Sequence, residues 1–268
     1  MRNLKISIVT VCYNAVDDVE STILSVLEQT YTNIEYILID GASTDGTIEV
    51  IKKYNQGIAK WVSEPDNGIY DAMNKGISLA TGDFIQFLNA GDVLNGKTVC
   101  EEWANQMIDN TALVYYGDMI MLCQEGRYYG RPGDLFSFNR SFPLFHPSTL
   151  VHRELIKQKM FDTKYRISAD YKLLRDLYLS GVVFHYVPIA LVQFDGIKGV
   201  SSNYPYTIFM ERGHIWGIDK GIKWQMRCFF FKNSIKAKFI LKKVVPPALR
   251  KVMHERNMIM SGMAKMEE

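Results

Sequence analysis

The chain contains little cysteine, and none of it forms a pattern that could organise the fold. Its four cysteines stand at positions 12, 100, 123 and 228, and no two form a CxxC pair of the kind that binds metal or performs redox chemistry. Such scattered cysteines also exclude a disulfide framework. An apolar core must therefore stabilise the protein, and 268 residues with 47% apolar and 22% charged residues are sufficient for one.

Membrane-spanning and targeting segments are missing as well. No uninterrupted apolar stretch approaches the ~20 residues that a membrane-spanning helix needs. The first three residues lead directly into a strand pattern, without the apolar core of a signal peptide. We therefore expect a cytoplasmic protein. These absences do not exclude peripheral contact with the inner face of a membrane.

Three phosphate-binding signatures are also absent. The chain has no GxxxxGK[ST] loop, which argues against an ATPase or kinase. No GxGxxG follows the first predicted strand, which argues against a dinucleotide-binding fold. The stretch TVCYNAVDD (10–18) lacks the Gly-rich basic signature of sugar nucleotidyltransferases. A nucleotidyltransferase therefore stays only as a weaker alternative.

Strand and helix patterns alternate through the first 94 residues. Short β-branched runs predict buried strands at 4–11, 34–40, 59–63 and 83–88, and apolar spacing predicts amphipathic helices between them. Such alternation with short connections predicts an α/β fold with a mostly parallel sheet and helices on both faces. Weaker patterns predict strands at 113–123 and 182–187 and a helix at 168–179, and a helical, aromatic, basic segment follows Pro205.

Polar residues gather where each of the first four strands ends. In parallel sheets ligands bind beyond the carboxyl ends of the strands, so these clusters converge on one edge. A nucleoside diphosphate placed there would meet carboxylates, which is unfavourable unless a divalent cation lies between them. Asp92, with Asn89 three residues earlier, is the natural ligand set for Mg²⁺.

Four stretches of the same region resemble family 2 glycosyltransferases, which have the nucleotide-sugar-binding GT-A fold. They are ISIVTVCYN (6–14), ILIDGASTDGT (37–47), SEPDNGIYDAMNKGI (63–77) and ATGDFIQFLNAGDVL (80–94), in the family's order and spacing. Weaker matches continue in FHPSTLVHRELI (145–156) and YRISADYKLLRDL (165–177). The sequence variants resemble a bacterial branch that builds surface polysaccharides. The resemblance implies a GT-A-like, Rossmann-like catalytic domain, which we expect at 1–204, and inversion at the anomeric carbon.

The resemblance also implies a role for each matching position. The residues implied in nucleotide-sugar binding are Thr10, Cys12, Tyr13, Asn14, Asp40, Asn74 and Asn89. Among them, Asp40 would bind the base, at the N3–H of uracil. Asp92 would bind Mg²⁺ or Mn²⁺, and Asp170 would act as the catalytic base that takes the proton of the acceptor hydroxyl.

The chain departs from the family pattern at three places. Asp40-Gly41 stands where many members carry two acidic residues after the second strand. Asn89-Ala90-Gly91-Asp92 replaces the usual Asp-x-Asp-Asp, so Asp92 is the only obvious carboxylate ligand. Met73 stands where many members carry an arginine that contacts phosphate.

Simpler interpretations of the candidate residues stay open. Asp40 could cap a turn, Asp45 is expected to be mainly structural, and Asp170 could be a first-turn carboxylate favoured by the helix dipole. His146 could bind metal or acceptor, or be an ordinary loop histidine. Glu64 and Asp66 flank a proline and could be turn residues.

The C-terminal segment 205–268 differs in charge from the rest of the chain. Residues 221–268 contain 11 Lys/Arg against 3 Asp/Glu, a net charge of +8, which leaves −6 for the first 220 residues. Aromatic residues alternate with these basic residues in KWQMRCFFFKNSIKAKFILKKV (223–244). This composition predicts a helical tail at a membrane interface, and the alternative is a helix packed on the catalytic domain. Because no nucleic-acid recognition motif accompanies the charge, we expect no nucleic-acid partner.

These observations favour an inverting glycosyltransferase that moves a hexose or N-acetylhexosamine, with UDP-sugar as the expected donor. The expected acceptor is a saccharide, lipid-linked and at the cytoplasmic face of the membrane, in polysaccharide biosynthesis. A non-catalytic module that only binds the nucleotide sugar is the second hypothesis.

Overall fold

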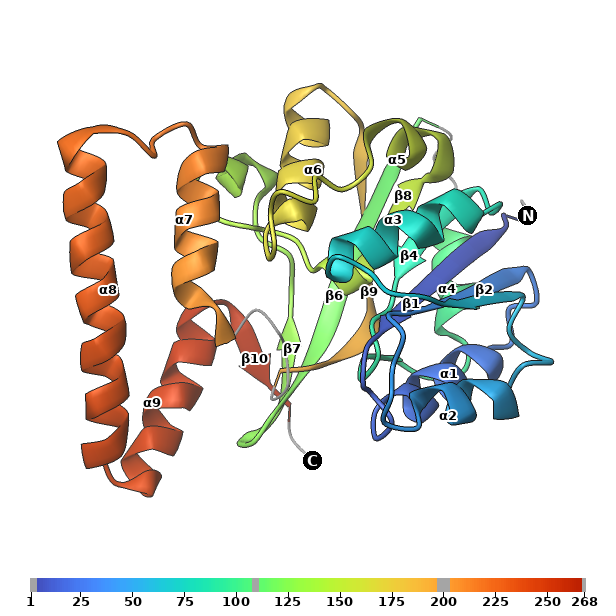
Figure 1. Cartoon of the computed structure of the whole chain (residues 1–268), viewed down its shortest axis with the longest axis horizontal. Helices are drawn as coiled ribbons and strands as arrows, with labels where there is room; N and C mark the ends of the chain where they lie inside the picture. Colours follow the sequence, from blue (N-terminus) through green and yellow to red (C-terminus); the bar gives the residue numbers. More distant parts are fainter. Residues whose placement is uncertain (1–3, 108–110, 197–202, 267–268) are drawn as a thin grey trace.

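The computed structural model describes residues 4–107, 111–196 and 203–266, apart from the side chains of residues 238–244, 247 and 248. One twisted sheet runs through these residues in the strand order β10-β7-β6-β8-β4-β1-β2-β3, and β9 pairs with both β5 and β6. Figure 1 shows this sheet at the centre of the molecule, with three C-terminal helices to one side.

The first half of the sheet is parallel, as the strand–helix alternation predicts. It consists of β1 (Ile6–Cys12), β2 (Ile34–Asp40), β3 (Lys60–Ser63) and β4 (Phe84–Phe87). The pairs β1–β2, β2–β3 and β1–β4 are all parallel, so these strands end at the same edge.

The second half of the sheet is mixed. Its strands are β5 (Val93–Leu94), β6 (Val114–Cys123), β7 (Gly126–Gly130), β8 (Thr149–His152) and β9 (Phe184–Asp195). β8 joins the halves because it pairs antiparallel with both β4 and β6. β9 runs parallel to β6 and antiparallel to β5, which brings the end of β9 beside the loop that follows β4.

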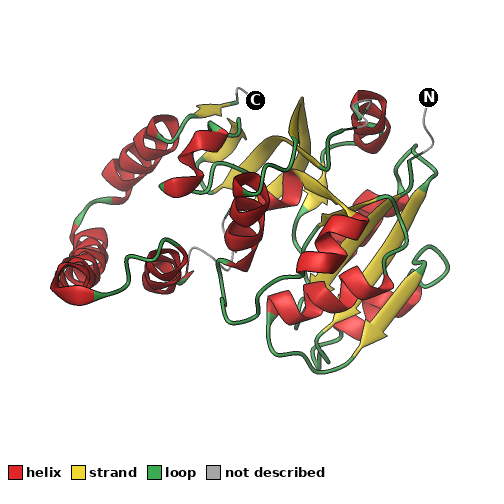
Figure 2. Ribbon diagram, turned by 90° about the horizontal axis from the view of Figure 1, so that it is seen from above, coloured by secondary structure: helices red, strands yellow, loops and turns green. Residues whose placement is uncertain are grey.

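Helices cover both faces of the sheet, as Figure 2 shows. Ile6 and Ile8 of β1 pack in a core with α1 (Val19–Leu27), α2 (Thr47–Lys53) and α4 (Val99–Gln106). Val9 and Val11 pack in the opposite core with α3 (Ile69–Leu79), α5 (Arg153–Lys159) and α6 (Ala169–Leu179). This alternation of β1 side chains between two cores is the two-residue period of a strand covered on both faces.

Three helices follow the sheet: α7 (Pro205–Ile215), α8 (Gly221–Val244) and α9 (Pro247–Met260). α8 packs on α7 through Phe209, whose ring stacks on Trp224 and Phe231 with centroids 5.0 Å and 4.2 Å away. The chain then returns through β10 (Met263–Lys265), which pairs antiparallel with β7 at the edge of the sheet.

The predicted tail is therefore joined to the rest of the molecule at both ends. α7 contacts the sheet domain: the Nε1 of Trp216 donates a hydrogen bond of 2.7 Å to the Tyr171 hydroxyl in α6. A domain boundary at residue 204 stays a prediction. Within the described residues every helix is too short or too polar to cross a membrane.

Candidate active site

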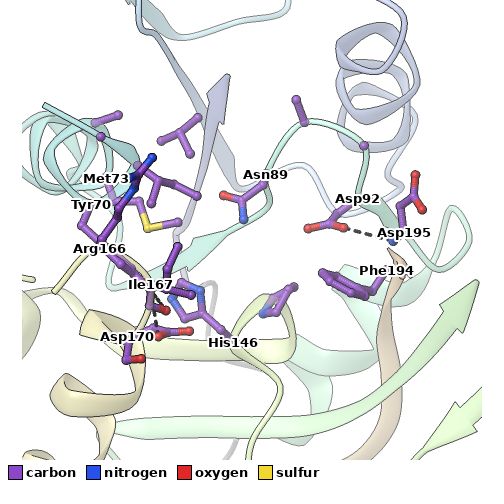
Figure 3. Close-up of a pocket in the computed structure, with 18 of the residues that line it drawn as sticks. Tyr70, Met73, Asn89, Asp92, His146, Arg166, Ile167, Asp170, Phe194 and Asp195 are labelled. Carbon is purple, nitrogen blue, oxygen red and sulfur yellow. Dashed lines mark hydrogen bonds between the residues drawn. The ribbon is translucent and has the colours of Figure 1, made fainter. Parts of the chain in front are cut away.

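A cavity of about 880 Å³ opens at the carboxyl ends of β1 and β4 and reaches the amino end of α6 and one face of α7. The predicted site residues that line it are Cys12, Tyr13, Asn14, Asn89, Asp92 and Asp170. Figure 3 shows Asp92 and Asp170 at opposite ends of this cavity, with Asn89 and His146 between them. Cys12 and Asp170, which are 158 positions apart in the sequence, thus line the same cavity.

Asp92 lies in a tight turn that its surroundings fix. The Thr22 hydroxyl donates to the Asp92 carbonyl at 2.8 Å and accepts from the Gly91 N–H at 3.0 Å. The side chain of Asp92 is only 4% exposed, and one oxygen accepts the backbone N–H of Asp195 at 3.3 Å. Burial raises the pKa of this carboxyl to about 7, and the nearby Asp195 charge adds to the shift.

The neighbouring Asn89 supplies a second oxygen. Its Oδ1 is buried and has no hydrogen-bond partner among the described residues. A buried carbonyl oxygen without a partner, next to a buried carboxylate that ionises with difficulty, fits a hard divalent cation such as Mg²⁺ or Mn²⁺. Within the described residues no three His, Cys, Asp or Glu side chains gather as a metal-binding group, so Asp92 and Asn89 would share the cation with ligand oxygens and water.

The loop after β1 forms another part of the wall. Asn14 adopts a positive φ of 47°, its N–H donates to the Ser43 hydroxyl at 2.8 Å, and its Oδ1 accepts the Thr44 N–H at 3.0 Å. Tyr13 beside it is 66% exposed and lines the cavity, so its ring is accessible to a planar group that stacks on it. The loops after β1 and β2 are thus tied together beneath an open aromatic surface.

Three predicted donor-binding residues do not line the cavity. Thr10 is fully buried, and its hydroxyl accepts from Tyr36 at 3.1 Å, because even-numbered β1 residues face the core with α1. The Asp40 carboxylate is also buried and accepts from the Ser43 N–H at 2.9 Å and the Ser63 hydroxyl at 2.7 Å.

Asn74 is the third residue outside the cavity wall. Its amide donates to the Phe161 carbonyl at 2.9 Å and accepts the Phe161 N–H at 2.8 Å, so both ends of the side chain hold one backbone segment. The contacts that the structure gives Thr10, Asp40 and Asn74 are structural, and a direct contact of any of them with a donor stays a prediction. Asp45 is structural as expected, since it accepts from Val16 and Thr47.

Asp170, at the start of α6, is held in one orientation by two donors. Its Oδ1 accepts the Tyr70 hydroxyl at 2.9 Å and the Tyr171 N–H at 2.7 Å. Because both contacts use Oδ1, the second carboxylate oxygen is the one left for a ligand. Burial, together with the charge of Asp170, raises the pKa of Tyr70 well above its usual value, so this phenol keeps its proton.

His146 lies near the same end of the cavity. Its ring stacks on Phe87 with centroids 5.4 Å apart and meets Phe161 edge-on at 5.8 Å. Burial lowers the pKa of His146, and the charge of Asp170 opposes this only in part, so the ring is neutral near pH 7. An uncharged imidazole between aromatic rings shapes the cavity wall.

Two residues that hold the site in place, Tyr70 and Glu211, lie outside the sequence prediction. Tyr70 stands inside the stretch SEPDNGIYDAMNKGI, and the structure identifies it as part of the site because it lines the cavity and contacts Asp170. Glu211 of α7 accepts three consecutive backbone N–H groups before α6: Arg166 at 2.6 Å, Ile167 at 3.1 Å and Ser168 at 2.8 Å. No sequence signal links Glu211 to a loop more than 40 positions away.

Comparison with known proteins agrees with this architecture. An uncharacterised glycosyltransferase of Mycobacterium tuberculosis is 42% identical over 95 residues, which cover 35% of this chain and 36% of the relative. The chain thus spans about a third of the length of the first curated relatives it matches. S. aureus TarS 1-349 in complex with UDP superposes with a TM-score of 0.64 at 18% identity, over 81% of this chain and 65% of that chain.

A second solved structure gives the same fold. The mannosyltransferase PcManGT from Pyrobaculum calidifontis, in complex with GDP-Man and Mn²⁺, superposes with a TM-score of 0.64 at 18% identity, over 82% of this chain and 66% of that chain. The GT-A-like fold predicted from the sequence is thereby confirmed. The profile of the family described as "Glycosyl transferase family 2" matches residues 7–176. Because this match covers more than half of the chain, the protein belongs to glycosyl transferase family 2.

Proposed function

We propose that the chain is an inverting glycosyltransferase that moves one sugar from a nucleotide-sugar donor to a hydroxyl of a saccharide acceptor. The observation that carries the proposal is one cavity with Asp92 and Asn89 at one end and the oriented carboxylate of Asp170 at the other. Such an arrangement suits a substrate whose negative leaving group and reacting hydroxyl lie on opposite sides of the transferred sugar.

In this proposal the chain's own residues perform distinct tasks. Asp170 accepts the proton of the acceptor hydroxyl as that oxygen attacks the anomeric carbon in line. Tyr70 holds Oδ1 of Asp170, so that the other oxygen points at the acceptor. Asp92 and Asn89 would bind Mg²⁺ or Mn²⁺, which when bound neutralises charge on the departing diphosphate. Tyr13 would stack on the base, beside Asn14 and Cys12.

The donor is proposed to be a UDP-hexose or UDP-N-acetylhexosamine. UDP and UDP-GlcNAc occur in complexes of TarS, and GDP-Man with Mn²⁺ occurs in the mannosyltransferase complex. These neighbours share only the fold with this chain, so they support the class of donor and its use of a divalent cation.

The acceptor is proposed to be lipid-linked and to be met at the cytoplasmic face of a membrane, in bacterial polysaccharide biosynthesis. The support is an apolar stripe on α8, formed by exposed residues at helical spacing: Ile222, Met226, Phe229 and Phe230. Exposed basic residues stand on both sides of it, Lys223 and Arg227 on one and Lys232 and Lys236 on the other. Apolar side chains bounded by snorkelling cations suit an anionic lipid surface.

A thermal-shift screen of nucleotide sugars with Mg²⁺ or Mn²⁺ tests the donor. A ligand at 100 times its dissociation constant adds roughly 2.7 kcal/mol of stability, which a melting curve resolves. Absence of any shift with all nucleotide sugars would overturn the proposal. A non-catalytic binding module would show the shift but no donor turnover, whereas the proposed enzyme hydrolyses or transfers the donor and loses this activity in Asp170→Asn.

A further inference from the structure

The base end of the cavity is lined by two arginines that come from different elements. Arg166 lies in the loop before α6, four positions ahead of Asp170, and Arg212 lies in α7. Tyr204, Ile208 and Arg212 follow each other at four-residue spacing and all line the cavity, so one face of α7 forms this wall. Figure 3 shows Arg166 on the Asp170 side of the cavity, away from Asp92.

Both guanidinium groups are held by aromatic rings and not by carboxylates. The Arg166 guanidinium stands 5.0 Å from the centroid of the Tyr204 ring, and that of Arg212 stands 5.3 Å from the Tyr171 ring. Neither forms an ion pair with an acidic side chain among the described residues. Stacking on a ring fixes the plane of a guanidinium and leaves its edge, which carries the N–H donors, for another partner.

Arg212 also has an unsatisfied hydrogen-bond donor. Its Nε is buried and has no hydrogen-bond partner among the described residues. A buried donor of a charged group that lacks a partner costs free energy unless a ligand or ordered water satisfies it. The donors of Arg166 and Arg212 are therefore available to an anion, and Asp170 is the negative side chain that lines the same end with them.

We propose that this end of the cavity is an acceptor subsite for a saccharide that carries an anionic group, which Arg166 and Arg212 bind while its hydroxyl meets Asp170. The inference rests on the proposed function, because it assigns this end to the acceptor. Planar guanidinium donors match phosphate and carboxylate oxygens in paired geometry. A phosphodiester of a lipid-linked saccharide and a uronic acid share this chemistry, and both are consistent with the two arginines.

Binding of three probes to the full chain, saturated with UDP and Mn²⁺, distinguishes the possibilities. The probes are an octyl hexoside, an octyl hexosyl phosphodiester and an octyl hexuronide, measured by calorimetry at low and at high salt. We expect an anionic probe to bind wild-type protein about ten- to hundred-fold more tightly than the neutral one, which is the usual value of a hydrogen bond to a charge. Tighter binding of the phosphodiester would identify the phosphate source, and tighter binding of the hexuronide the acidic sugar.

Variants connect this preference to the two arginines. Arg166→Gln and Arg212→Gln should each lower the affinity for the anionic probe about ten-fold or more and leave the neutral probe and UDP unchanged. Arg212→Lys keeps the charge and should retain part of the preference. Arg127→Gln removes the same charge from β7, where the side chain is exposed outside the cavity, and should change nothing.

Two outcomes would overturn the inference. In one, wild-type protein binds the neutral probe as tightly as both anionic probes, a result that needs no variant to fold. In the other, the anionic preference persists in both Arg→Gln variants. Either result leaves the donor thermal shift and the donor turnover intact. Failure of the proposed function removes the shift or, for a non-catalytic module, the turnover, so the two failures are distinguishable.

Discussion

Glu211→Gln should weaken the contact between α7 and the loop that precedes Asp170, and it should leave donor binding unchanged. The Glu211 carboxylate accepts three backbone N–H groups at residues 166–168, immediately before the helix that carries Asp170. Glutamine keeps one oxygen and presents an NH₂ group to the remaining donors, so at least one of the three bonds is lost. Loss of a hydrogen bond to a charged acceptor costs about 1.5–3 kcal/mol.

This cost falls on the loop whose conformation sets the position of Asp170. If loop order limits catalysis, the loss corresponds to about a ten- to hundred-fold lower turnover. Hydrogen exchange should show faster exchange of the amides at 166–168, and the thermal shift with UDP should not change. Glu255→Gln is the matched control, because Glu255 in α9 pairs with Lys265 and is remote from the loop. Wild-type turnover and equally slow exchange in Glu211→Gln would refute the reasoning.

Three other predictions follow from described contacts. Asp170→Asn should keep donor affinity and lower turnover by about 10²–10⁴. Asp176→Asn, six positions further along α6, should stay near wild type, and equal rates in both variants would place the base elsewhere. Glu35 of β2 is buried, and its carboxylate accepts the Ser7 hydroxyl at 2.6 Å and the Thr81 N–H at 2.7 Å. Glu35→Gln should therefore lower the free energy of unfolding by roughly 1.5–3 kcal/mol near pH 7. Burial raises the pKa of Glu35, but hydrogen bonds from neighbouring hydroxyl and N–H groups outweigh it and lower the pKa to about 2. The carboxylate therefore stabilises the fold above the pKa that it has in the unfolded chain, and this stabilisation is lost as pH falls through the pKa of the folded state. The free energies of urea unfolding of wild type and Glu35→Gln should converge near pH 2. A difference that does not change with pH would contradict this. Phe229→Glu with Phe230→Glu should weaken flotation with anionic vesicles while the UDP thermal shift stays unchanged, and undiminished flotation would remove α8 as the contact.

The sequence located the parallel half of the sheet because its strands are continuous apolar runs between amphipathic helices. β2 begins and ends at the predicted residues, and β6 and α6 each start within one residue of the prediction. β5 contains only Val93 and Leu94, and its pairing with β9 depends on residues a hundred positions away. Periodicity cannot detect a strand of this length, and the same holds for β10.

The residues of the candidate site were also predicted only in part. Asp92 and Asp170 lie at element ends that local patterns mark, and the cavity includes both. Asp40 also ends a strand, but whether a carboxylate faces a ligand or its own turn depends on Ser43 and Ser63, and this is decided by three-dimensional packing. Tyr70 and Glu211 act through contacts across 100 and 43 to 45 positions, which no spacing rule within one element predicts.

The pairing of β10 with β7 has a consequence for any shortened form of the chain. β10 covers the outer side of β7 and is itself only three residues long, which leaves little unpaired backbone at the border of the sheet. A truncation that removes it would leave the N–H and C=O groups of β7 without their partner strand, the arrangement through which sheets of separate molecules join. Chains shortened from the C-terminus are therefore expected to self-associate. Their sedimentation with vesicles would then report aggregation, and point substitutions on α8 are the cleaner measure of affinity for lipid.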